Sequence, residues 1–199
     1  MPRHMPEKLE CASMDSVAIC GLQASLEWLK TVEHGDPYKP AVEFLEGLQK
    51  HGIETTPLRR GDVINCGGLT IDVLHDAGNY VNYNCVNDTG AVLRVHYPNR
   101  DVLFLADIEV PAAKEMMELY TPEQLRCDIV QLAHHGQNGA HREFYELVQP
   151  KIALYTAPLW LWTNNDGAGP FKTLETRRWM RELGVVLSCP HCHGDFLLV

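Results

Sequence analysis

DVLFLADIEVPAAKEMMELYTPEQLRCDIVQLAHHGQ, residues 101–137, carries the clearest structural pattern in the sequence. It contains two apolar runs of strand length, at 101–106 and 128–133, and the segment between them has the periodicity of a helix. Asp107 follows the first run, and the His134-His135 pair follows the second, just before a glycine that permits a sharp backbone turn. Because sites in open α/β sheets form beyond the carboxyl ends of the strands, we expect these three side chains on one edge of a sheet.

The rest of the chain alternates between strand-like and helix-like segments. Period-two patterns predict a hairpin over 61–74 that turns at Gly67-Gly68, and a helical spacing over 37–51 predicts a helix that Gly52 ends. Further strands are expected at 91–97, 152–155, 185–188 and 196–199, and further helices at 140–148 and 170–183. The pattern predicts the α/β class, with a mixed sheet flanked by helices. We expect a divergent or poorly ordered segment over 1–35 and a folded subdomain over 36–199.

Composition limits the possible partners. The chain has 199 residues, 45% of them apolar, which suits one domain with a real core. Its formal charge of −9 repels nucleic acid at long range, so binding a phosphodiester would need bound cations or a local basic groove. No apolar run approaches the length that spans a bilayer, which predicts no membrane partner. The seven cysteines are an odd number, and residues 1–10 lack an apolar signal, so a reduced, cytoplasmic setting is expected.

Four segments in a fixed order point to a known family. They are Gly61-Asp62, Asn87-Asp88-Thr89, Leu103 to Asp107, and Asp128 to Gly136. Together they resemble the C-terminal half of a metallo-β-lactamase-fold hydrolase, specifically of the ComEC competence-protein type, over about residues 36–199. The resemblance implies the C-terminal half of an αββα sandwich with metals at the edge of the sheet. It departs from the family where Gln137 replaces the usual serine.

The resemblance also implies roles for individual residues. Asp107 would bridge two metals and His135 would be a further ligand, both of them catalytic, with His134 as neighbour or alternate ligand. Imidazole and carboxylate suit zinc or manganese, which lower the pKa of a bound water. The substrate would be a phosphodiester, contacted by residues at two positions: Asn87, Asp88 and Thr89 before a strand, and Gln137 after the histidine pair.

One family feature is missing. The N-terminal motif His-x-His-x-Asp-His, which supplies most of the ligands in that family, does not occur in this sequence. We therefore expect a truncated fold whose hydrolytic activity alone is weak or nil. The alternative is a non-catalytic remnant or binding module. Half a sandwich would leave one apolar sheet face exposed, or covered by residues 11–30 or by a second copy in a homo-oligomer.

Simpler interpretations stay open for the same residues. Asp107 could be the N-cap of a helix that starts near Val110, and the histidine pair could be a hydrogen-bonded strand end. Asn87 and Asp88 are common turn formers. The segment 189–193, CPHCH, resembles a thiol–disulfide or haem-attachment motif and could also bind a thiophilic metal. It lacks the downstream helix that a redox pair needs, so a turn between closing strands is favoured.

Overall fold

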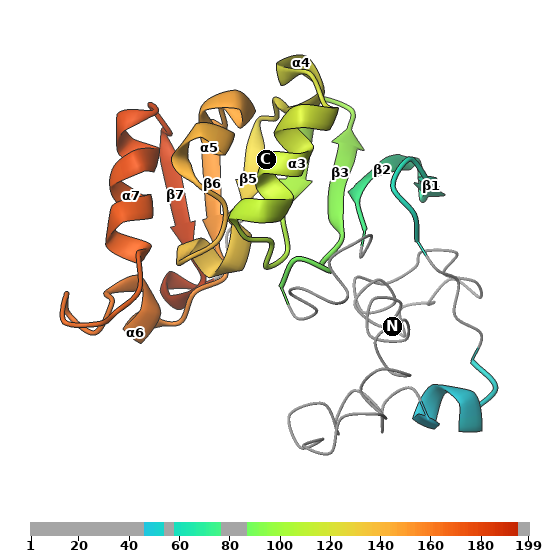
Figure 1. The fold of residues 1–199 in the computed structure, drawn as a ribbon, viewed down its shortest axis with the longest axis horizontal. Coiled ribbons are helices and arrows are strands. Elements are labelled where there is room, and N and C mark those ends of the chain that lie inside the picture. The colour runs from blue at the N-terminus through green and yellow to red at the C-terminus, as the bar shows by residue number, and fades with distance from the viewer. Residues whose placement is uncertain (1–45, 54–57, 77–86, 195–199) are drawn as a thin grey trace, which may run out of the picture.

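The computed structural model describes residues 46–53, 58–76 and 87–194 (Figure 1). The boundary predicted at residue 35, most of the helix predicted over 37–51 and the strand predicted at 196–199 lie outside these ranges. Residues 46–50 are helical, and Gly52 follows with φ 65°, the left-handed conformation expected where a helix ends. Within the described ranges, no helix is long and apolar enough to cross a bilayer.

Seven strands of the described residues form one sheet, in which each strand pairs with its neighbours among them in the sequence. The first four are antiparallel: β1 (Val63–Cys66), β2 (Leu69–His75), β3 (Val92–Tyr97) and β4 (Arg100–Phe104). The next three continue parallel to β4: β5 (Ile129–Gln131), β6 (Ile152–Tyr155) and β7 (Leu187–Pro190). Gly67 and Gly68 have φ 57° and 85°, as a two-residue type I′ hairpin turn requires. The prediction of a mixed α/β sheet is confirmed.

Helices fill each parallel connection. The first holds α3 (Val110–Leu119) and α4 (Pro122–Leu125), the second α5 (Arg142–Val148), and the third α6 (Leu159–Trp162) and α7 (Thr173–Glu182). Right-handed crossovers that advance in one direction place their helices on the same face of the sheet, and Figure 1 shows α3, α5 and α7 on one side. There Met116, Phe144 and Met180, all fully buried, join the strand residues Leu103 and Val130 in the main core.

The opposite face of the sheet is also apolar. Val73, Leu93 and Phe104 belong to a second cluster, to which the helices between 110 and 182 contribute no residue. Beside it, a groove of about 430 Å³ is lined by residues of this face and of the β3–β4 turn: Tyr97, Pro98, Asn99, Arg100, Val102, Phe104, Ile129 and Leu154. The described residues therefore form two layers. That a second copy covers this face stays a prediction.

Two elements of the structure differ from the prediction. The last described strand runs over 187–190 instead of 185–188, because an edge strand tolerates Pro190, which has no N–H to donate. In addition, residues 159–162, for which the sequence pattern predicts no helix, form the short helix α6.

The cysteines differ in state. Cys127 and Cys189 are buried free thiols, as expected for small hydrophobic residues, and burial raises the pKa of Cys127 to about 12. Cys66 is disulfide-bonded, so the prediction of reduced cysteines is wrong at this position.

His96 connects three strands of the meander and should make stability depend on pH. Its Nε2 lies 2.8 Å from Asp72 Oδ2, and its Nδ1 lies 2.9 Å from Asp101 Oδ1. The bond to Asp72 and then that to Asp101 raise the pKa of His96 above its usual 6.5, against the opposing effect of burial. A raised pKa stabilises the folded state below pH 6.5, and this contribution is lost as the pH rises through the raised pKa.

We therefore expect the free energy of unfolding to contain a component that falls as the pH rises above about 6.5. Urea titrations between about pH 5.5 and 8.5 should show it, and His96→Gln should remove it. If His96→Gln keeps the same pH slope as the parent chain, the bridging histidine is not its source.

Candidate metal and substrate site

The proposed site residues lie where successive parallel strands end. Asp107 follows β4, the pair His134-His135 follows β5, and Thr156 follows β6. Because these strands are parallel, their carboxyl ends share one edge of the sheet. The prediction that Asp107 and His135 lie on the same edge is confirmed.

Asp107 and His135 face each other. The distance from His135 Nε2 to Asp107 Oδ1 is 3.6 Å, which is too long for a hydrogen bond. On its other side, His135 Nδ1 lies 2.9 Å from Thr156 Oγ1. Both side chains of the first pair are 40% exposed, so a small ligand can reach them.

His134 and Glu109 form a second pair beside the first. His134 Nδ1 lies 3.6 Å from Glu109 Oε1, and this nitrogen is buried without a hydrogen-bond partner. Glu109 Oε1 also accepts a hydrogen bond of 2.7 Å from Asn87 Nδ2. The rings of His134 and His135 lie edge to face with their centroids 5.9 Å apart. Two nitrogen–oxygen pairs of equal spacing therefore sit together at this edge.

The backbone that carries the histidines is strained. His134 and His135 have φ 48° and 60°, in the left-handed region, inside the short 3-10 turn η2 (Ala133–Gly136). Ala106, which precedes Asp107, also has φ 48°, and its carbonyl accepts a 2.9 Å hydrogen bond from His134 N. Each such residue costs about 1–2 kcal/mol. Strain of this kind is typical of functional sites, where the surrounding structure maintains it.

The residues predicted to bind substrate have structural contacts. Asp88 and Thr89 are buried, and Asp88 Oδ1 accepts a 2.6 Å hydrogen bond from Glu109 N. The carbonyl of Gln137 accepts a 3.4 Å hydrogen bond from Thr176 Oγ1. A role for Asn87, Asp88, Thr89 and Gln137 in substrate binding stays a prediction.

Helix capping does not explain Asp107. The N-cap of α3 is Glu109, and Pro111 lies in its first turn, so the interpretation of Asp107 as the N-cap is wrong. Pro111 fixes the start of the helix because proline is favoured at its first positions. The side chain of Asp107 is thus left facing His135.

The CPHCH segment forms the end of β7 and a 3-10 turn, η3 (His191–His193). A turn therefore follows the first of the two predicted closing strands, and the second, at 196–199, lies outside the described residues. Burial raises the pKa of the Cys189 thiol, whereas a redox-active first cysteine needs a lowered pKa. His193 packs edge-on against Trp162, with ring centroids 5.9 Å apart.

Glu109 and Thr156 were missed from the sequence. Thr156 had a usable signal, since it is the first residue after the third strand expected to end at this edge. The sequence signal for Glu109 was weaker, since it consists only of its position two residues after Asp107. Only the turn after β4 brings its carboxylate to His134.

The donor chemistry fits a divalent cation in two-point coordination. Two ligand atoms that bind the same cation at about 2.1 Å, with a tetrahedral angle between them, lie about 3.4 Å apart. This is close to the nitrogen–oxygen distance of 3.6 Å in both pairs. The buried, unpartnered Nδ1 of His134 also suits a ligand. Within the described ranges, however, no group of three or more His, Cys, Asp or Glu could hold a metal. The site therefore offers two donors from each pair.

No known family and no curated protein matches this sequence. Among solved structures, the chain is similar to a putative metal-dependent hydrolase from Parabacteroides distasonis, with 15% identity and a TM-score of 0.44 over 71% of this chain and 60% of that one. It is similar to a mutant of the CmlA β-hydroxylase, with 14% identity and a TM-score of 0.45 over 71% and 34% of the two chains. It is also similar to the metallo-β-lactamase-fold protein YhfI of Bacillus subtilis, with 12% identity and a TM-score of 0.44 over 73% of this chain and 57% of that one. The chain spans less than two thirds of each of these structures.

Proposed function

We propose that this protein is a metal-dependent hydrolase of phosphodiesters whose site includes Asp107 and His135. The observation that supports this most is the facing of His135 Nε2 and Asp107 Oδ1 across 3.6 Å at the carboxyl edge of the sheet. If Thr156 Oγ1 accepts the Nδ1 proton of His135, the Nε2 lone pair faces a carboxylate. Two acceptors this close repel each other unless a cation or a proton lies between them.

The chain's own residues prepare the site for hydrolysis. Thr156 fixes the orientation of the His135 ring, and the left-handed backbone at 134 and 135 turns both imidazoles to the edge. The exposure of Asp107 and His135 lets an ester approach from solvent. A divalent cation held there would supply an activated water and neutralise charge on the phosphoryl oxygens.

A second function, a non-catalytic binding module, is favoured by one observation. Catalytic zinc sites usually take three protein ligands, whereas the described residues offer no group of three. A module of this kind would bind a cation or an anionic ligand at the same edge without turnover.

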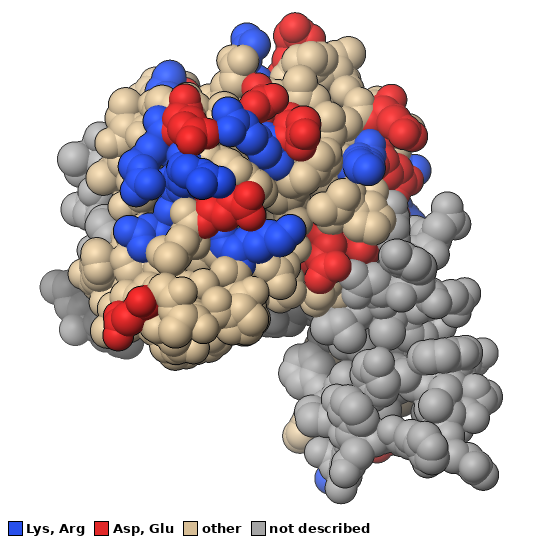
Figure 2. All heavy atoms as spheres, turned by 60° about the vertical axis from the view of Figure 1, so that its left-hand side comes forward, with Lys and Arg blue, Asp and Glu red and all other residues tan. Residues whose placement is uncertain are grey.

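The surface charge argues against a large nucleic acid as the substrate. Figure 2 shows basic side chains gathered on one side of the molecule with acidic side chains between them. On α5 and α7, Arg142 pairs with Glu146 and Glu182, and Arg178 pairs with Glu175 and Glu182. These ion pairs weaken the attraction of Arg142 and Arg178 for a polyanion, and the formal charge of the whole chain is −9. A small phosphodiester fits this surface better.

Metal binding tests the proposed site directly. Titration calorimetry with manganese or zinc should show weak binding of a divalent cation, and Asp107→Ala or His135→Ala should each weaken it by about tenfold or more. His191→Ala, which removes an exposed histidine of η3, is the matched control and should leave the affinity unchanged. Equal affinity in the parent chain and both site variants would refute the assignment of these ligands.

A further inference from the structure

Four apolar side chains gather in and beside the segment between β6 and α7. Leu159, Trp160 and Leu174 are 60%, 50% and 40% exposed. The rings of Trp160 and Phe171 lie 5.8 Å apart. Single exposed hydrophobic residues are ordinary, but a group that includes two aromatic rings in contact marks a binding surface. We call residues 159–172 the aromatic loop.

The aromatic loop is held in a fixed conformation. The buried Asn164 donates hydrogen bonds of 2.9 Å from Nδ2 to the carbonyls of Gly169 and Phe171, and its Oδ1 accepts one from Phe171 N. A Cβ on Gly169 would come within 2.3 Å of Asn164 Oδ1, so only glycine fits there. Arg177 covers the Trp162 ring at 3.8 Å. The exposed Trp160 ring and the half-buried Phe171 ring are thus presented by a fixed support, which lowers the entropic cost of binding.

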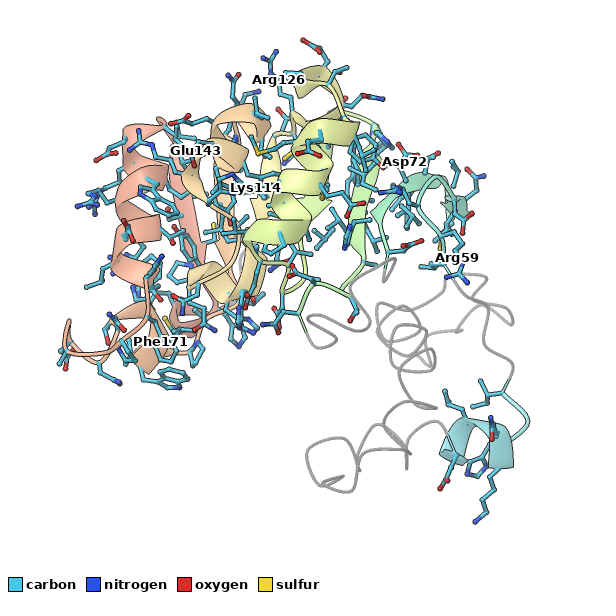
Figure 3. All side chains as sticks on the ribbon, viewed as in Figure 1. Arg59, Asp72, Lys114, Arg126, Glu143 and Phe171 are labelled. Atoms are coloured by element: carbon cyan, nitrogen blue, oxygen red, sulfur yellow. The ribbon has the colours of Figure 1, made fainter. Side chains whose placement is uncertain are left out.

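The aromatic loop is bonded to the segment that carries His135. Lys172 N donates a 3.2 Å hydrogen bond to Asn138 Oδ1. On α7, Thr176 Oγ1 lies 3.4 Å from the Gln137 carbonyl and 3.2 Å from the Lys172 carbonyl. At the other end of the loop, α6 begins shortly after Thr156, which bonds His135. Figure 3 shows Phe171 beside α6, at the end of the sheet where the parallel strands finish. The segment that carries the two rings therefore borders the segments that carry His135 and Thr156.

We propose that Trp160 and Phe171 form a preformed subsite that stacks an aromatic ring of the substrate whose anionic ester group reaches Asp107 and His135. This proposal rests on the proposed hydrolase function for the position of the ester, but the subsite itself consists of the two rings. Trp and Phe offer flat apolar faces that favour offset stacking with another ring. The substrate class is accordingly an ester that carries an aryl group or a nucleobase next to its phosphoryl centre.

Binding of inert probes tests the subsite without requiring turnover. Phenylphosphonate and methylphosphonate carry the same anionic group and differ in the ring, and saturation-transfer NMR on the full chain measures both. We expect phenylphosphonate to bind more tightly than methylphosphonate, with saturation transferred to its ring protons. Trp160→Ala should lower the affinity for phenylphosphonate by about tenfold, and Trp160→Phe should retain most of the affinity. Leu119→Ala, which removes an apolar side chain of similar exposure at the end of α3, away from this surface, is the control and should have little effect.

Two further measurements distinguish a failure of the subsite proposal from a failure of the hydrolase proposal. If His135→Ala abolishes cation binding but leaves ring saturation intact, the subsite stands as proposed. If His135→Ala has no effect on the cation, the hydrolase proposal fails while the subsite stands. Adenosine 5′-monophosphate binding more tightly than phenylphosphonate would assign a nucleobase, and the reverse order a simple aryl group. Equal binding of the phenyl and methyl probes, or an unchanged affinity in a folded Trp160→Ala variant, would overturn the proposal.

Discussion

Replacing Gly136 with alanine is expected to lower the free energy of unfolding by about 2–5 kcal/mol. A Cβ at this position would come within 2.5 Å of Cδ1 of Tyr155, whose ring is almost completely buried and cannot move aside. The residue also has φ 79°, which glycine adopts freely and alanine does not. The clash with Tyr155 and the backbone strain therefore both lower the free energy of unfolding of this variant. Urea denaturation of the two proteins measures the difference.

Gly184→Ala separates these two causes. Gly184 has φ 80°, nearly the same as Gly136, but a Cβ there would have no atom within 4 Å. Gly184→Ala should therefore lower the free energy of unfolding only by the backbone strain of a left-handed alanine, about 1–2 kcal/mol. Because Gly136 directly follows the histidine pair, the Gly136 variant should also bind a divalent cation less well, whereas the Gly184 variant should not. Equal losses of stability in the two variants would contradict the packing argument.

The second large effect concerns turnover. Purified protein with added manganese or zinc is expected to hydrolyse a generic aryl phosphodiester weakly or not at all. Each nitrogen–oxygen pair offers two protein ligands, and catalytic zinc sites usually take about three. A loosely held ion spends little time at the position where it could activate water. Release of the aryl alcohol, followed by absorbance with each metal, measures the rate.

Robust turnover that depends on metal and disappears in His135→Ala would overturn this expectation. It would mean that residues outside the described ranges, such as His34, or a partner chain complete the coordination. His75 is a poor candidate, because it is 2% exposed and its Nε2 lies 2.8 Å from the Asp88 carbonyl. His75→Ala should therefore disturb folding more than metal affinity.

Much of the sheet could be predicted from local patterns. Gly67-Gly68 indicates a hairpin because few other residue pairs adopt the two left-handed conformations that its turn needs. The apolar runs at 101–106 and 128–133 indicate buried parallel strands, and strand polarity then places Asp107 and His135 on one edge. Patterns of this kind are less informative at the ends of elements, and the strand predicted at 185–188 accordingly begins two residues before β7.

The details of the site could not be predicted in the same way. The left-handed conformation of two successive histidines contradicts their intrinsic preference, and only the turn after β5 imposes it. The pairing of Glu109 with His134 depends on where α3 begins, which Pro111 determines. The conformation of the aromatic loop depends on Asn164, and its placing beside the segment that carries His135 depends on Asn138, which accepts a hydrogen bond from Lys172 N, 34 residues away in the sequence.

The order of the strands has a consequence for how the chain reaches its native state. Since every described strand of the sheet pairs with the next described strand in the sequence, no pairing among them has to bridge another strand. The contact order of the sheet is accordingly low for a structure of seven strands, which favours rapid folding. The meander of β1 to β4 needs only reversals of chain direction, whereas β5, β6 and β7 each wait for a helical crossover. During synthesis, the antiparallel half can therefore form while the parallel half is still being made, and its edge strand β4 is then the template on which β5 docks.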